Sequence, residues 1–132
     1  MDITFLLNGE TVKLKNANPH LTCLDFLREM RSLTGTKEGC NEGDCGACTV
    51  IVCDNHTVKP LNACILFLGQ LNGKAVRTVE AIGEDGHLHP VQSKMVEKHG
   101  SQCGFCTPGI VTSLVAAQIN ERSDYDNVIA GN

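Results

Sequence analysis

The chain has 132 residues, a formal net charge of -4, and a composition that is 42% hydrophobic and 20% charged. No apolar run approaches the roughly 20 residues of a membrane span, no signal peptide is visible at the N-terminus, and no basic run is present to bind nucleic acid. We therefore expect a soluble, cytoplasmic, globular protein with neither a membrane nor a nucleic-acid partner.

Two short apolar stretches near the N-terminus predict a β-hairpin. Residues 3–7 and 11–15 alternate apolar with other side chains, and Asn8 and Gly9 lie between them. Asn-Gly is favoured in tight hairpin turns because both residues accept a positive φ.

A helix is predicted from about residue 23 to about residue 31. Thr22 is suited to cap it, and Leu24, Leu27 and Met30 repeat at helical spacing as its apolar face. Two further strands are predicted at residues 47–53 and 75–79. The first 80 residues are therefore expected to form a small sheet with one helix packed across it.

Two helices are predicted in the second half of the chain. One runs from Pro90 to about residue 99, and the other begins at Thr107 as its cap, followed by Pro108. The apolar stripe expected on the second helix consists of Ile110, Val111, Leu114, Val115 and Ile119. A linker is expected at residues 83–86 and a short third helix from Ser123.

Eight cysteines in a reducing compartment indicate metal ligation or redox chemistry rather than disulfides. Cys40, Cys45 and Cys48 lie in the stretch GCNEGDCGAC at residues 39–48, and Cys64 follows sixteen residues later. This spacing, C-x4-C-x2-C with a distant fourth cysteine, is the pattern of plant-type [2Fe–2S] proteins. A structural zinc site is the alternative, although zinc sites usually use two facing C-x2–4-C pairs.

The interleaved glycines have a physical role in this interpretation. Three thiolates can surround one side of a small cluster only if the backbone comes close to it with its N–H groups pointing inward. A Cβ would obstruct that approach, so Gly39, Gly43 and Gly46 are expected where the loop is tightest.

A second pair, Cys103 and Cys106, forms a lone C-x2-C, which fits zinc, a redox dithiol or an iron–sulfur site. Two thiolates cannot complete a [2Fe–2S] site.

Cys23 and Cys53 match no ligand spacing and are expected to be ordinary, partly buried residues. The histidines are expected to be solvated or structural, and they are His20, His56, His87, His89 and His99.

Three stretches together carry a specific resemblance that covers essentially the whole chain. They are TGTKEGCNEGDCGACTV at residues 34–50, LNACI at 61–65 and GSQCGFCTPGI at 100–110. They resemble the iron–sulfur subunits of the molybdenum hydroxylase (xanthine dehydrogenase/oxidase) family, most closely the N-terminal region of bacterial xanthine dehydrogenases. The resemblance implies an α+β chain with a ferredoxin-like β-grasp [2Fe–2S] domain at residues 1–80 and a helical [2Fe–2S] domain at 81–132. The helical domain would be a four-helix bundle that is incomplete at its C-terminus.

The resemblance also implies roles for individual residues. Cys40, Cys45, Cys48 and Cys64 would bind the first cluster, and Cys103 and Cys106 would supply half of the ligands of the second. Gln102 occupies the place of a glutamine that touches the pterin of the molybdenum cofactor. The family pattern continues beyond Asn132 into a C-x-C segment that this chain lacks, so we expect the second cluster to be incomplete here and Cys103 and Cys106 to be free thiols.

The expected function is electron relay in an oxidoreductase, with no complete active site in this chain alone. The implied partners are a molybdopterin-binding large subunit, whose molybdenum centre hydroxylates a purine ring carbon, and an FAD-binding domain or subunit that reduces NAD. The rival interpretations are a stand-alone [2Fe–2S] ferredoxin and a structural zinc module. The helical half argues against the first of these, because a free ferredoxin needs no second domain.

Overall fold

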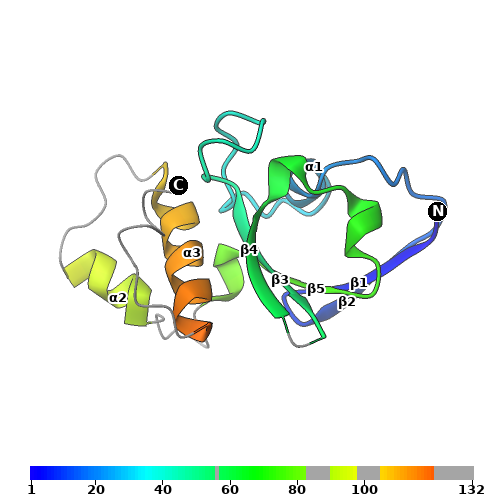
Figure 1. Cartoon of the computed structure of the whole chain (residues 1–132). Coiled ribbons are helices and arrows are strands. Elements are labelled where there is room, and N and C mark those ends of the chain that lie inside the picture. Colours follow the sequence, from blue (N-terminus) through cyan, green and yellow to red (C-terminus); the bar gives the residue numbers. More distant parts are fainter. Residues whose placement is uncertain (56, 83–89, 98–104, 121–132) are drawn as a thin grey trace.

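The computed structural model describes residues 1–55, 57–82, 90–97 and 105–120. The predicted linker at 83–86, the third helix from Ser123 and the end of the first C-terminal helix at 98–99 lie outside these residues. Within the described residues, a five-stranded sheet forms the centre and helical segments pack on both of its faces (Figure 1).

The N-terminal hairpin is confirmed. Strands β1 (Ile3–Leu7) and β2 (Glu10–Leu14) pair antiparallel. The second strand begins one residue before the predicted position. The turn residues Asn8 and Gly9 have φ angles of 52° and 86°, both in the left-handed region that this turn requires.

The sheet has the strand order β2-β1-β5-β3-β4. Strand β1 runs parallel to β5 (Ala75–Arg77), and β3 (Thr49–Asp54) is antiparallel both to β5 and to β4 (Thr57–Asn62). Strands β3 and β5 agree with the two predicted strands apart from their bounds.

Strand β4 was not predicted from the sequence. It contains Pro60, which cannot donate a backbone hydrogen bond and is therefore tolerated only at the edge of a sheet. The strand lies at that edge, and its mostly exposed or half-buried side chains give no alternating apolar signal.

The predicted helix after Thr22 is present as α1 (Cys23–Asp25), which continues directly into a π-helical turn, η1 (Phe26–Met30). The Thr22 hydroxyl accepts a hydrogen bond from the backbone N–H of Asp25 at 3.2 Å, as predicted. The prediction that Met30 faces the core was wrong, because its side chain is 60% exposed. The π-helical turn has a wider repeat than an α-helix, so the apolar spacing drifts off the buried face.

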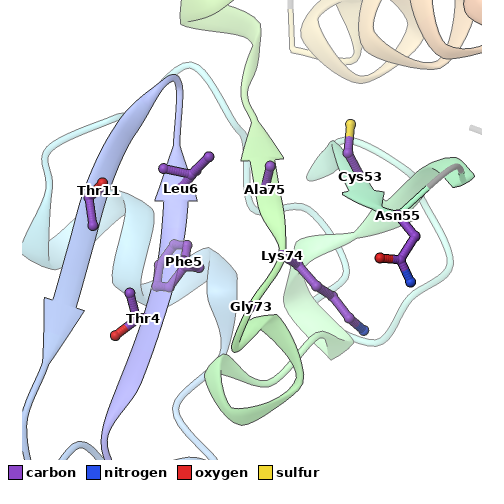
Figure 2. A pocket seen from close by; sticks show the side chains of 9 residues that line it. All are labelled: Thr4, Phe5, Leu6, Thr11, Cys53, Asn55, Gly73, Lys74 and Ala75. Carbon is purple, nitrogen blue, oxygen red and sulfur yellow. The ribbon is translucent and has the colours of Figure 1, made fainter.

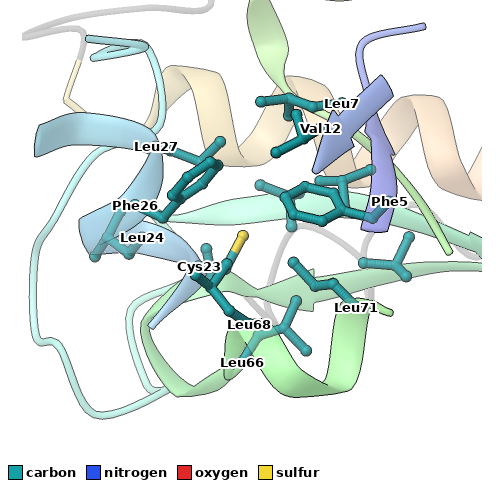
Figure 3. Packing of buried hydrophobic residues seen from close by; sticks show 14 of the residues in the cluster. Phe5, Leu7, Val12, Cys23, Leu24, Phe26, Leu27, Leu66, Leu68 and Leu71 are labelled. Carbon is teal, nitrogen blue, oxygen red and sulfur yellow. The ribbon is translucent and has the colours of Figure 1, made fainter. Parts of the chain in front are cut away.

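The main core lies between this helix and one face of the sheet (Figure 3). Phe5 of β1 and Phe26 of η1 meet edge to face with ring centroids 5.8 Å apart. Two short helical segments, η2 (Ala63–Ile65) and η3 (Leu68–Leu71), also contribute buried residues to this core. The predicted sheet with one helix packed across it is therefore confirmed.

Leu27 and Met30 give a matched test of this core. Leu27 is fully buried, so Leu27→Ala is expected to lower the free energy of unfolding by about 2–5 kcal/mol, through lost apolar burial and the cavity left behind. Met30→Ala on the same helix should change it by less than about 0.5 kcal/mol, because the side chain is exposed. Urea unfolding followed by circular dichroism measures both. Equal losses in the two variants would contradict this assignment of the buried face.

The opposite face of the sheet carries a second, smaller core. Residues alternate along β3, so Val50 and Val52 face the main core while Ile51 faces the C-terminal helices. Ile51 packs with Val111 and Val115 of α3 (Thr107–Ile119). Helix α2 (Pro90–Glu97) and the short helical turn η4 (Val79–Ala81) also contact α3. Strand β3 thus joins the two halves of the chain.

Two details of α3 differ from the prediction. Cys106, rather than Thr107, occupies its capping position. Of the predicted apolar stripe, Val111 and Val115 are buried, but Ile119 is 54% exposed, and the small residue Ala116 is buried instead. Helix α3 packs on β3, and a small side chain such as Ala116 allows a close approach.

The mixed sheet and packed helices confirm the predicted α+β fold class. None of the described helices is long and apolar enough to cross a bilayer.

Candidate metal centre

The pairing of β3 with β4 brings the four predicted ligands of the first cluster to one place. Cys40, Cys45 and Cys48 lie on the loop that precedes β3, and Cys64 lies in η2 directly after β4. The backbone N–H of Ala63 donates to the carbonyl oxygen of Cys48 at 3.3 Å, which sets Cys64 beside Cys48. Their thiols interact with each other, as do those of Cys40 and Cys45. Two pairs of thiols fit a cluster in which two irons share four cysteine ligands.

Six backbone N–H groups point at three of these sulfur atoms. The Cys40 sulfur accepts from Glu42, Asp44 and Cys45 at 3.2–3.4 Å. The Cys45 sulfur accepts from Cys40 and Ala47, at 3.4 and 3.5 Å, and the Cys64 sulfur accepts from Gly43 at 3.2 Å. Inward-pointing N–H groups stabilise negative charge, so the loop is built to hold thiolates. This is the feature expected around an anionic iron–sulfur cluster.

Each of the three loop glycines occupies a position that a side chain would disturb, for different reasons. A Cβ on Gly39 would lie 2.6 Å from Cys45 Sγ. Gly43 and Gly46 have φ angles of 80° and 72°, which favour glycine. A Cβ on Gly43 would also press against the Ile65 side chain at 2.9 Å, so at that position the loop is tight against η2.

The stem of the loop is fixed by two charged side chains, one from the preceding turn η1 and one from η4. The guanidinium of Arg28 on η1 donates from one nitrogen to the carbonyl oxygens of Thr34 and Thr36, at 3.0 and 2.9 Å. The carboxylate of Glu80 accepts from the backbone N–H of Gly35 at 2.8 Å. Both contacts hold the chain where it enters the thiol loop.

We expect Arg28→Met to lower the free energy of unfolding of the metal-free protein by about 1–3 kcal/mol, because two loop carbonyls lose a charged donor. Amide hydrogen exchange across residues 34–47 should become faster. Arg28→Lys keeps the charge and a multiple donor on a side chain of different shape, so its loss should be intermediate. Unchanged exchange in Arg28→Met would show that the loop is held by other contacts.

Hydrogen bonding and burial shift the cysteine pKa values in opposite directions. The backbone N–H groups of Cys45, Glu42 and Asp44 lower the pKa of Cys40 to about 7. Burial raises the pKa of Cys48 to about 11 and that of Cys23 to about 12, and the neighbouring Cys48 thiol adds to the rise at Cys23. Of Cys40, Cys48 and Cys23, Cys40 therefore has the thiol that ionises most readily.

This difference predicts a pH dependence of alkylation in the metal-free protein. Only the thiolate reacts, so the rate at Cys40 should rise with pH and reach half its maximum near pH 7. Cys23 should stay unmodified over the same range, because it is 1% exposed and its thiol remains protonated. Iodoacetamide labelling followed by peptide mass spectrometry measures both rates. A midpoint for Cys40 near its ordinary value of 9.0 would contradict the role given to the N–H groups.

The structure describes only part of the second predicted site. Cys106 is exposed at the start of α3, whereas Gln102 and Cys103 lie outside the described residues. All seven cysteines in the described part of the chain are free of disulfides. In that same part, no three Cys, His, Asp or Glu side chains are placed to hold a single metal ion.

Other candidate residues lie away from the thiol loop. Cys23 is buried in the main core, and Cys53 is half-buried on β3, so both behave as structural residues, although Cys23 is more buried than predicted. His20 is exposed and packs against Phe67, with ring centroids 5.7 Å apart. A pocket of about 450 Å³ opens on the sheet, where Leu6 of β1, Ala75 of β5 and Cys53 are neighbours (Figure 2). None of the predicted ligands lines it.

Sequence reasoning did not find Arg28, Glu80, Asn62 or Gly109. The Asn62 amide donates to the carbonyl oxygen of Gly43 at 2.9 Å, and a Cβ on Gly109 would collide with the carbonyl oxygen of Gly46. Glu80 and Asn62 leave no local signal because their partners are distant in the chain, and Arg28 leaves none because it bonds only to backbone carbonyl oxygens. Gly109 did leave one, since a glycine in the first turn of an apolar helix usually has a packing reason.

Comparisons with known proteins agree with this geometry. A family model described as a 2Fe-2S iron-sulfur cluster binding domain matches residues 5–68, and one described as a [2Fe-2S] binding domain matches residues 78–132. The chain is 43% identical over 141 aligned positions to the xanthine dehydrogenase/oxidase of Rattus norvegicus, and 47% identical over 120 to aldehyde oxidase 2 of Mus musculus. These alignments cover 99% and 86% of this chain but only 11% and 9% of the relatives, so the chain spans about a tenth of their length.

Solved structures show the same similarity. Quinoline 2-oxidoreductase from Pseudomonas putida 86 contains a chain that superimposes with a TM-score of 0.87 at 32% identity, covering 100% of this chain and 81% of that one. Aldehyde oxidoreductase from Desulfovibrio gigas superimposes with a TM-score of 0.84 at 33% identity, over 97% of this chain and 14% of its own.

Proposed function

Because the chain belongs to the iron–sulfur region of the molybdenum hydroxylase family, we propose that it is the electron-transfer part of a larger oxidoreductase. The observation that carries this proposal is the loop whose six N–H groups point at the sulfurs of Cys40, Cys45 and Cys64. We propose that these three cysteines and Cys48 bind one [2Fe–2S] cluster. When bound, such a cluster takes up and gives back single electrons, which is the chemistry that a relay needs.

The residues of the chain have distinct tasks in this proposal. The thiols bind the irons, and the backbone N–H groups stabilise the negative charge that the ligands bring and that reduction increases. Gly39 leaves room for the backbone to approach, and Arg28 keeps the stem of the loop in place. Cys48 and Cys64 are buried, at 2% and 5% exposure, so water is excluded from one pair of ligands.

We propose a second site on the helical half, in which Cys103 and Cys106 supply two of the ligands. The family model that matches residues 78–132 supports it, and so does the position of Cys106 at the start of α3, where the helix dipole favours a thiolate. Gln102 is proposed to contact a pterin. Residues 1–80 and 81–132 are proposed as two domains, with the second contributing to a four-helix bundle.

The proposed partners are a molybdopterin-binding subunit or domain and an FAD-binding one. The relatives are named for oxidation of xanthine, aldehydes and quinoline, so the substrate would be a purine, an aldehyde or another aromatic heterocycle bound outside this chain. Because these relatives are much longer than this chain, the stand-alone ferredoxin is not favoured. We propose a cytoplasmic location, which free cysteines support.

The test is a reductive titration of the protein after anaerobic loading with iron and sulfide. We expect a red-brown protein that takes up one electron per loaded cluster from dithionite and shows a rhombic EPR signal when reduced. Loaded protein that takes up no electrons would overturn the proposed relay function.

A further inference from the structure

A phenylalanine from the second cysteine motif lies against the first thiol loop. A Cβ placed on Gly39 would lie 3.4 Å from ring carbon Cε1 of Phe105 and 2.6 Å from Cys45 Sγ. The ring and the thiol therefore share the space that Gly39 leaves open. Phe105 directly precedes Cys106, although it is 66 residues from Gly39 in the sequence.

A second contact joins the same two segments. Gly109 is buried in the first turn of α3, and a Cβ there would collide with the carbonyl oxygen of Gly46 and lie 3.1 Å from Cα of Ala47. Backbone therefore rests directly on backbone, immediately after Cys45. Glycine disfavours a helix, so its presence in α3 is explained by this contact.

We propose that Phe105 is a positioning residue that closes the Cys45 side of the first thiol loop against water, and that the contact of Gly109 with Gly46 holds it there. This inference rests on the proposed function, in that it concerns the cluster which Cys45 would help to bind. Phe105 would take part in the first site without being a ligand. It would also link the first ligand set to the motif that carries Cys106.

The consequence is a control of reduction potential. A bound cluster becomes more negative on reduction, and water stabilises added charge better than an aromatic ring does. Covering Cys45 with Phe105 therefore lowers the potential of the first site. Removing the ring, or pushing α3 away from the loop, should raise it.

The first measurement is a redox titration of the loaded protein followed by EPR. Phe105→Ala and Gly109→Ala should shift the midpoint of the first cluster to more positive values, by about tenfold in the equilibrium constant, which is 59 mV for a one-electron couple. Phe105→Leu should shift it less. The matched control is Phe67→Ala, because Phe67 is 40% exposed, similar to Phe105 at 47%, but packs against His20. An unchanged midpoint in Phe105→Ala at full iron occupancy would overturn the inference.

The second measurement needs no cluster and separates this inference from the proposed function. In the metal-free protein, alkylation of Cys45 by iodoacetamide should become severalfold faster in Phe105→Ala and Gly109→Ala, and stay unchanged in Phe67→Ala. Equal rates in all four proteins would overturn the shielding role even if a cluster binds. Faster alkylation in a protein that cannot be loaded would support the shielding and overturn only the proposed cluster.

Discussion

Replacing Cys45 with serine is expected to abolish binding of the cluster at the first site. The Cys45 sulfur lies at the centre of the loop, where it accepts two backbone hydrogen bonds and faces the open side of Gly39. Iron–sulfur clusters bind soft sulfur ligands, whereas a serine oxygen is harder and smaller than a thiolate sulfur. Iron bound at this site after anaerobic loading should fall from about two atoms per chain to almost none.

Cys53→Ser is the matched control for Cys45→Ser. Cys53 is half-buried on β3, where it packs in the smaller core with α3, and it lies after the thiol loop rather than in it. The variant should therefore keep its iron and its EPR signal. Loss of iron in Cys53→Ser, or full loading in Cys45→Ser, would show that the ligand assignment is wrong.

Replacing Gly46 with valine is expected to have the second-largest effect. Gly46 has a φ of 72°, and a β-branched residue held there is strained by about 1–3 kcal/mol. Its carbonyl oxygen also accepts from the Thr49 hydroxyl at 2.6 Å and contacts Gly109, so the strained residue cannot move freely. We expect a lower free energy of unfolding and lower iron occupancy, with the sheet still folded.

Gly73→Val separates backbone strain from damage to the loop. Gly73 has a similar φ of 79°, and nothing lies within 4 Å of a Cβ placed on it. Both valine variants should therefore lose stability in urea unfolding, Gly46→Val the more of the two, whereas only Gly46→Val should lose iron. Full occupancy in Gly46→Val by iron analysis would mean that the loop tolerates the distortion.

Local chemistry allowed several features to be predicted from the sequence. The Asn8-Gly9 turn needs two positive φ angles, and the Thr22 cap needs only a neighbour three residues away, so both were visible in the chain. The loop of residues 39–48 was equally visible, because thiols and glycines at fixed spacing have few other uses. These features depend on short stretches; the structure confirms the turn and the cap, and the ligand role of the loop stays a prediction.

Features that depend on distant contacts were missed or misjudged. Strand β4 contains Pro60 and is recognisable only from its place at the sheet edge. The support that Arg28 and Glu80 give to the loop requires elements that meet only after folding. The buried face of α3 was misjudged because the periodicity of an apolar helix does not say which neighbour it packs on. Here that neighbour is β3, and small residues such as Ala116 face it.

The measurement that tests the central claim most directly is a count of iron, zinc and acid-labile sulfide in the anaerobically loaded protein, with Cys45→Ser alongside. The account predicts iron and sulfide in equal amounts, with about two of each per chain bound at the first site and lost in Cys45→Ser. Zinc without sulfide, or iron that is retained in Cys45→Ser, would contradict it.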